Sequence, residues 1–224
     1  MKTITSILML STVWLLASCD KNDSIDNEGD KPQQNYDGKV KSGTFYVDAT
    51  SYTQWIYIDL HGESLSMTTS TISLEDYSES GVPESWDFAM HRYDVKTNGG
   101  GVMQTSFDSI EQLESSMTQA PDEGWTEDVY SDKSITVDMS HMMEGYIVYA
   151  PGHKNETAGQ WLSVDTSNMP PSYSKSDKVF LYRFADGTCA AIQLKNYMSD
   201  DKNMTKGWMT VLYKYPMFVN VEKK

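Results

Sequence analysis

Four methionines lie where a methionine has no packing role. Met139, Met142 and Met143 occupy one short polar segment that ends at Gly145, and Met169 precedes two prolines. A methionine normally fills irregular gaps in an apolar core, and a polar turn offers no such gap. An exposed thioether either covers an apolar patch or binds a soft metal centre, such as copper(I) or haem iron. The residues alone leave both interpretations open.

The remaining residues offer little catalytic chemistry. The histidines His61, His91, His141 and His153 are not spaced like zinc ligands. The chain contains no serine-hydrolase elbow, zinc-protease helix, P-loop or dinucleotide-binding motif. Acidic residues are numerous, so a hydrolase with a carboxylate pair stays open, but abundance alone does not identify such a pair. We therefore expect a protein that is not an enzyme.

The charge balance argues against two classes of partner. The 224 residues carry 32 acidic side chains against 18 lysines and arginines, a formal net charge of −14. Only two arginines occur, Arg92 and Arg183. An acidic chain binds phosphate backbones and anionic lipid surfaces poorly. We expect no nucleic-acid partner, and contact with a membrane only through a lipid anchor.

The first residues form an export signal. Lys2 precedes an apolar run of a length typical of signal peptides, which closes with the sequence Leu-Ala-Ser before Cys19. This ending resembles a bacterial lipobox, in which the cysteine thiol receives the lipid. We expect residues 1–18 to be a lipoprotein signal peptide, Cys19 to be lipidated and residues 19–41 to be a polar, acidic tether. The predicted location is the outer membrane, exposed at the cell surface, with shedding left open.

The second cysteine has no partner once Cys19 is acylated. Cys189 follows the turn Asp186-Gly187 and precedes an apolar run. This position favours a small buried side chain over a nucleophile.

From residue 42 onward the pattern is that of β-strands. Short runs rich in β-branched and aromatic residues occur at 45–47, 55–58, 134–137, 146–149, 179–182 and 209–213. Asp186-Gly187 between two such runs predicts a hairpin, and only residues 110–117 favour a helix. The predicted fold is all-β, a single domain of antiparallel sheets over residues 42–224, with long loops at 139–145 and 166–173. The three glycines at 99–101 are expected to form a flexible turn.

Several segments, in order, resemble one family. The run Trp-Asp-Phe-Ala-Met-His-Arg-Tyr-Asp-Val at 86–95, followed by Thr-Asn-Gly-Gly at 97–100, is similar to the hallmark segment of the HmuY family of haem-binding lipoproteins from Gram-negative anaerobes. Residues 179–187 resemble the family's late hairpin, and residues 212–216 its C-terminal strand. Within the hallmark segment we expect Arg92, Asp87 and Asp94 to form a charge network.

The resemblance implies a haem-binding site on two loops. Family members hold one haem (iron protoporphyrin IX) between two extended loops, with histidines as axial ligands in some members and methionines in others. The second loop here has no histidine, so Met169 is the expected ligand there. The first loop offers Met142, which we favour, with Met143 and His141 as alternates.

The resemblance also implies partners. The expected role is a haemophore-like protein that captures haem, with host haemoproteins as donors, and passes it to an outer-membrane TonB-dependent haem receptor. The alternative is a surface glycan-binding β-sandwich lipoprotein, a class that also exposes tryptophan and tyrosine.

Overall fold

The computed structural model describes residues 39–165, 167 and 170–219. The predicted signal peptide, Cys19 and Met169 therefore lie outside the described residues. The described residues belong to one compact unit. Within them, no helix has the length and apolar character needed to cross a membrane.

A six-stranded antiparallel sheet forms the larger layer. Its strands, in spatial order, are Lys41–Asp48 (β1), Lys206–Met217 (β16), Cys189–Met198 (β15), Phe180–Arg183 (β14), Gly101–Gln104 (β8) and Thr126–Glu127 (β9). The hairpin between β14 and β15 turns at Asp186-Gly187, and Gly187 has a φ of +86°. A left-handed residue at this point suits a glycine, as the sequence predicts.

A four-stranded sheet packs against the first. Its strands, in spatial order, are Ser66–Thr69 (β3), Ile56–Asp59 (β2), Phe88–His91 (β6) and Asp94–Thr97 (β7). Two further short strands, Thr71–Ile72 (β4) and Glu79–Ser80 (β5), pair with each other.

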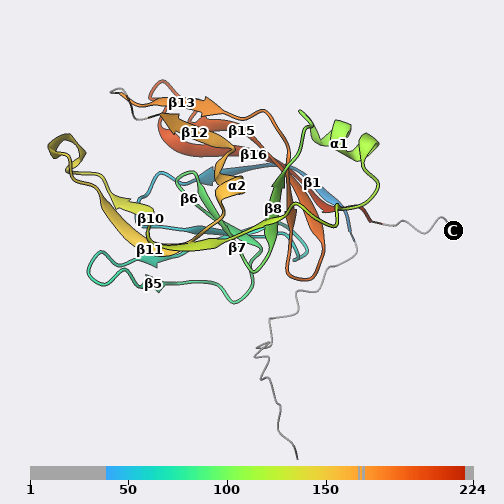
Figure 1. The fold of residues 1–224 in the computed structure, drawn as a ribbon, viewed down its shortest axis with the longest axis horizontal. Helices are drawn as coiled ribbons and strands as arrows, with labels where there is room; N and C mark the ends of the chain where they lie inside the picture. Colours follow the sequence, from blue (N-terminus) through green and yellow to red (C-terminus); the bar gives the residue numbers. More distant parts are fainter. Residues whose placement is uncertain (1–38, 166, 168–169, 220–224) are drawn as a thin grey trace, which may run out of the picture. The chain divides into compact units, whose positions relative to one another are not determined.

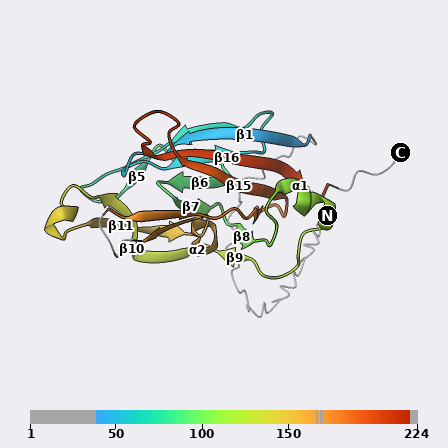
Figure 2. The ribbon, with the colours of Figure 1, turned by 90° about the horizontal axis from the view of Figure 1, so that it is seen from above.

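Side chains alternate along the strands and bind the layers together. In β2, Ile56 and Ile58 enter the main core with Phe88 and Phe180, whereas Tyr57 enters a second cluster on the opposite face of the sheet. Burial on both faces explains why the first three residues of β2 are apolar or aromatic. The other face of the six-stranded sheet is covered by the helix Ile110–Ser116 (α1). Figures 1 and 2 show this layering around the two sheets.

Two hairpins extend from this framework. The longer pairs Val129–Asp138 (β10) with Val148–Lys154 (β11), and the shorter pairs Leu162–Asp165 (β12) with Ser172–Lys175 (β13). A single helical turn, Glu156–Gly159 (α2), connects them. Both hairpins point toward the same end of the unit, on the left in Figure 1, and α1 lies at the opposite end.

The predicted all-β class with antiparallel sheets is confirmed. The predicted strands lie at or beside observed ones, and the predicted helix is α1. Several boundaries differ. β11 begins at Val148, two residues later than expected, and β13 already includes Ser172 and Tyr173. β1, β10 and β16 are longer than the predicted runs.

The triple glycine also differs from expectation. A Cβ atom on Gly100 would lie 2.2 Å from the backbone oxygen of Arg183, and Gly101 already belongs to β8. Two backbones approach closely at Gly100, so this glycine serves packing, whereas Gly99 supplies a φ of +68° in the preceding bend.

Candidate functional site

The first predicted loop closes the β10–β11 hairpin with a compact turn. Met142–Glu144 form one turn of 3₁₀ helix (η1), and the amide of Met142 donates to the carbonyl of Met139 over 3.0 Å. Gly145 ends the turn with a φ of +81°, and its amide donates to the carbonyl of Met142 over 3.0 Å. The loop therefore has a defined backbone that presents its side chains at the hairpin tip.

The candidate ligands of this loop differ in exposure. Met143 is 84% exposed, Met142 is half-buried and His141 is exposed. Consecutive side chains of a 3₁₀ helix are about 120° apart, since the helix has about three residues per turn. Met142 and Met143 consequently point in different directions, and only one of them can face a given ligand.

His141 has a carboxylate partner within the loop. Its Nδ1 lies 3.1 Å from Oε2 of Glu144. A carboxylate on one ring nitrogen fixes the imidazole and leaves the other nitrogen available, an arrangement common among metal-bound histidines. The structure thus keeps His141 as a chemically competent alternate.

Aromatic side chains beside this loop are exposed in a way that suits a flat apolar ligand. Tyr146 is 61% exposed and Tyr149 is 40% exposed. Ala150, the next residue of β11, packs into the cluster around Trp55, so the alternation of the strand turns Tyr149 to the outer face. Met143, Tyr146 and Tyr149 are thus three exposed side chains with apolar surface, at the hairpin tip and at the start of β11.

The second predicted loop joins β12 to β13, and its proposed ligand, Met169, lies outside the described residues. The strand after the loop is well defined: Tyr173 stacks on Tyr197 with ring centroids 5.6 Å apart and an interplanar angle of 16°. The hydroxyl oxygens of Tyr173 and Tyr93 lie 3.4 Å apart. The second loop is thus anchored to the core by one tyrosine.

Arg92 lies at the β6–β7 turn in contact with this tyrosine group. It has a φ of +55°, which is uncommon for a residue other than glycine. The guanidinium Nη1 donates to the carbonyl of Thr50 over 2.5 Å, and the guanidinium carbon lies 4.4 Å from the ring centroid of Tyr52. The predicted charge network with Asp87 and Asp94 is wrong, because these carboxylates pair with His61 and Lys154 instead.

A buried histidine pairs with two carboxylates away from the loops. His61 Nδ1 lies 2.6 Å from Asp87 Oδ1, and its Nε2 lies 2.9 Å from Asp186 Oδ2. With Asp59, these residues bring three possible ligand atoms within 4.8 Å. Asp59 already accepts from the backbone amide of His61, over 2.8 Å, and from Ser85. The group is a hydrogen-bonded structural network.

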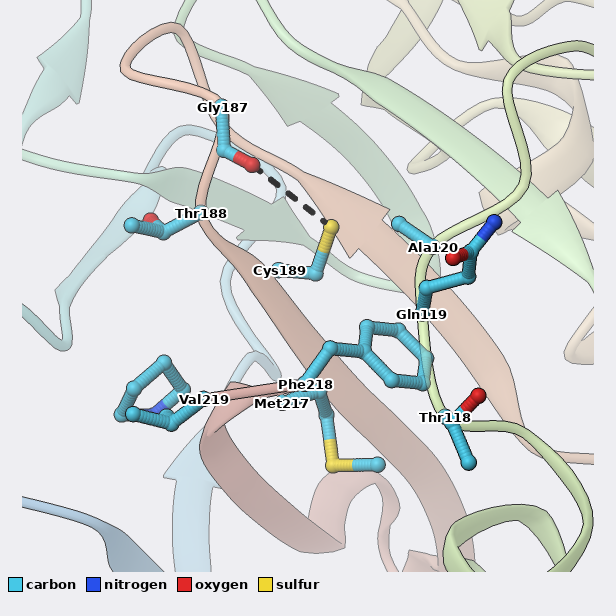
Figure 3. A pocket seen from close by; sticks show the side chains of 10 residues that line it. Thr118, Gln119, Ala120, Gly187, Thr188, Cys189, Met217, Phe218 and Val219 are labelled. Atoms are coloured by element: carbon cyan, nitrogen blue, oxygen red, sulfur yellow. Dashed lines mark hydrogen bonds between the residues drawn. The ribbon is translucent and has the colours of Figure 1, made fainter. Parts of the chain in front are cut away.

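A separate pocket of about 510 Å³ lies at the α1 end of the unit. Figure 3 shows Cys189 in its wall, with the thiol directed toward the carbonyl of Gly187, 3.9 Å away. Cys189 is 2% exposed, and burial raises the pKa of its thiol to about 11. The prediction of a buried cysteine is confirmed.

Sequence reasoning predicted the first loop as a candidate site and did not predict the Arg92–tyrosine group. Its members come from distant segments, so no local spacing marks them. The one available signal was the rarity of arginine combined with the position of Arg92 in the hallmark segment.

Comparisons with known proteins identify relatives. The model of the HmuY protein family matches residues 51–213. A solved Bacteroides fragilis protein described as a lipoprotein is 43% identical, with 78% of this chain and 89% of that chain covered and a TM-score of 0.69. A Bacteroides vulgatus structure described as an HmuY-like haem-binding protein is also 43% identical, with 80% and 93% covered and a TM-score of 0.68.

A more distant structure shares the fold. The apo HmuY analogue of Tannerella forsythia is 22% identical, with 79% of this chain and 96% of that chain covered and a TM-score of 0.62. At this identity the likeness establishes the fold alone. No curated protein matches the chain.

Proposed function

The chain belongs to the HmuY family, and on this premise we propose that it is a haem-binding lipoprotein. The relative from Bacteroides vulgatus, described as HmuY-like and haem-binding, supports this at 43% identity over most of both chains. The observation that carries the proposal within this chain is the exposure of three side chains, Met143, Tyr146 and Tyr149, at and beside the β10–β11 tip. Exposure of such groups to water is unfavourable, so an apolar ligand that covers them is bound with a favourable free energy.

The proposed axial ligands come one from each hairpin. Met142 supplies a thioether from η1, and Met169 supplies one from the loop between β12 and β13. The common direction of the two hairpins supports this arrangement (Figure 1). Met143 and His141 are the alternates for the first position, and His141 has the partner Glu144 that would orient it.

The ligand chemistry sets the redox preference. A thioether is a soft, neutral donor, so it favours ferrous over ferric iron and raises the reduction potential of the bound haem. Exposed loops also permit release. In this proposal the chain is a carrier rather than an enzyme.

The route of the cargo follows from the proposed location. Residues 1–18 direct export, Cys19 carries the lipid and residues 19–41 tether the single domain to the outer membrane, exposed at the cell surface. The carrier takes haem from host haemoproteins and passes it to a TonB-dependent receptor. The relative described as a lipoprotein supports the anchor.

The test is a titration of the lipid-free protein with haemin under dithionite, followed in the Soret band. We expect a stoichiometric Soret shift that Met142→Ala and Met169→Ala each abolish. Met67→Ala is the matched control, because Met67 is an exposed methionine of β3. No shift in the wild-type protein contradicts the proposal and favours glycan binding instead. A shift that survives both methionine variants contradicts the ligand assignment.

A further inference from the structure

Two cations and four tyrosines gather beside the second loop. This cationic tyrosine cluster consists of Arg92, Lys206, Tyr52, Tyr93, Tyr173 and Tyr197. Its members come from the segment before β2, the β6–β7 turn and the strands β13, β15 and β16. Five parts of the chain thus converge on one small region.

Arg92 is a buried cation without a carboxylate partner among the described residues. It is 8% exposed, its Nη1 donates to the carbonyls of Ala49 and Thr50, and its Nε has no hydrogen-bond partner. A buried guanidinium normally pairs with an anion, because transfer of an uncompensated charge from water is costly. The positive charge of Arg92 is therefore available to an incoming anion.

Lys206 adds a second positive charge. Its Nζ lies 4.6 Å from the ring centroid of Tyr173, and no ion pair of Lys206 occurs among the described residues. The neighbouring Gly207 links the two cations: a Cβ atom there would lie 2.8 Å from Nη1 of Arg92. Both cations thus lie around the same strand end.

The acidic side chains closest in sequence to Lys206 have other partners. Asp200 and Asp201 lie in the β15–β16 connection close in sequence to Lys206. The carboxylate of Asp200 accepts from Asn196, and that of Asp201 accepts from Ser199 and from the side chain of Asn203. The chain has a net charge of −14, so most of its surface is expected to be acidic. A region with two cations that pair with no described carboxylate differs from that average.

The tyrosines supply neutral donors. When the hydroxyl of Tyr93 or Tyr173 donates to the other across 3.4 Å, the accepting hydroxyl keeps its own proton free to donate elsewhere. Burial raises the pKa of Tyr93 to about 12, with a further contribution from the hydrogen bond of Tyr173. The hydroxyl of Tyr93 is consequently protonated at neutral pH.

The cluster is close to the proposed ligand loop. Tyr173 is the second residue of β13 and follows Met169 by four positions. Tyr173 thus lies in the strand that directly follows the proposed ligand loop, and its ring centroid lies 4.6 Å from Nζ of Lys206. The cluster therefore adjoins the end of the loop that the proposed function assigns to the haem.

We propose that the cationic tyrosine cluster binds the propionate carboxylates of the porphyrin, with Lys206 and Tyr173 as the direct donors and Arg92 as the buried charge behind them. This inference rests on the proposed function, because it assumes a haem on the two loops. It adds a polar anchor that fixes the orientation of the porphyrin edge, which the axial ligands alone do not determine.

The experiment compares two ligands that differ only in these carboxylates. Haem and its dimethyl ester are titrated into the protein under dithionite, in the same mild detergent. The variants are Lys206→Met, which keeps the length and removes the charge, and Tyr173→Phe, which keeps the stacking on Tyr197. Lys202→Met is the matched control, since Lys202 is an exposed lysine of the same β15–β16 connection.

We expect the wild-type protein to bind haem roughly tenfold more tightly than the ester, the effect of one charged hydrogen bond. Lys206→Met should weaken haem by about the same factor, leave the ester unchanged and preserve the Soret maximum. Tyr173→Phe should produce a smaller loss with the same selectivity. Lys202→Met should bind both ligands like the wild-type protein.

Two outcomes overturn the inference while the proposed function stands. In one, haem and its ester bind equally well to the wild-type protein. In the other, Lys206→Met weakens both ligands alike, which indicates a structural role for the lysine. If neither ligand produces a Soret shift, the proposed function itself fails, and this inference fails with it.

Discussion

The imidazole of His141 and the carboxylate of Glu144 are held together within one turn, with Nδ1 3.1 Å from Oε2. The two residues begin and end the same 3₁₀ turn that contains Met142 and Met143. An oriented imidazole nitrogen, which is a harder donor than a thioether, and two soft thioethers therefore occupy adjacent positions at one hairpin tip. The oxidation state of the iron decides which of them binds better.

The first prediction concerns which of these side chains binds the iron. Under reducing conditions, His141→Ala and Met143→Ala should each keep the Soret shift, with affinities within about threefold of the wild-type protein, because Met142 supplies the thioether that ferrous iron favours. The measurement is the dithionite titration described above. Loss of the shift in His141→Ala alone would assign the first axial ligand to the histidine.

The second prediction concerns the reduction potential. Replacement of Met142 by histidine introduces a stronger donor to ferric iron, so the potential of the bound haem should fall. Each tenfold gain in ferric over ferrous affinity corresponds to about 59 mV for a one-electron couple. Spectroelectrochemical titration of the wild-type and Met142→His proteins measures the difference. An unchanged potential would mean that residue 142 does not bind the iron.

The sequence predicts the framework well because its strands follow simple alternation. In β2, Ile56 and Ile58 face one core and Tyr57 the other, and this pattern is local. The methionines of the first loop are also recognisable, since a thioether in a polar turn conflicts with its usual place in a core. Both inferences need only a few consecutive residues.

The cationic tyrosine cluster was not predictable in this way. Tyr93 and Tyr173 meet although 79 residues separate them in the chain, and Lys206 reaches the same place from β16. Neither spacing nor composition encodes such a contact. The predicted partners of Arg92 were wrong for the same reason. Its guanidinium donates to the carbonyls of Ala49 and Thr50, and Asp94 forms its ion pair with Lys154 instead.

The third prediction tests the close approach at Gly100. Gly100→Ala places a Cβ atom 2.2 Å from the backbone oxygen of Arg183, so either β8 or β14 must move. We expect a loss of about 2–3 kcal/mol in the free energy of unfolding, as is typical of overpacking against backbone. Gly145→Ala is the control, because no atom lies within 4 Å of its added Cβ and only the left-handed φ opposes it, at about 1 kcal/mol. Urea unfolding measures both, and equal losses would contradict the packing explanation.

The fourth prediction concerns the buried pair of His61 and Asp87. Burial opposes a charge on His61, but the hydrogen bonds and charges of Asp87 and Asp186 outweigh this effect and raise the pKa of the imidazole above its ordinary value of 6.5. The folded state therefore binds a proton more tightly than the unfolded state. The stabilisation is fully present below about pH 6.5 and is lost as the pH rises through the folded-state pKa.

Unfolding in urea between pH 6 and 9 tests this dependence, and the free energy of unfolding should decrease toward the alkaline end. His61→Gln should flatten the profile and lower the stability by about 3–5 kcal/mol near neutrality, because the buried carboxylate of Asp87 loses its cation. His153→Gln is the control, since His153 is an exposed histidine on β11 and its replacement should leave the alkaline slope intact. A wild-type stability that is constant or rises over this range would mean that His61 is neutral in the folded protein, and the two carboxylates would then have to be held by hydrogen bonds alone.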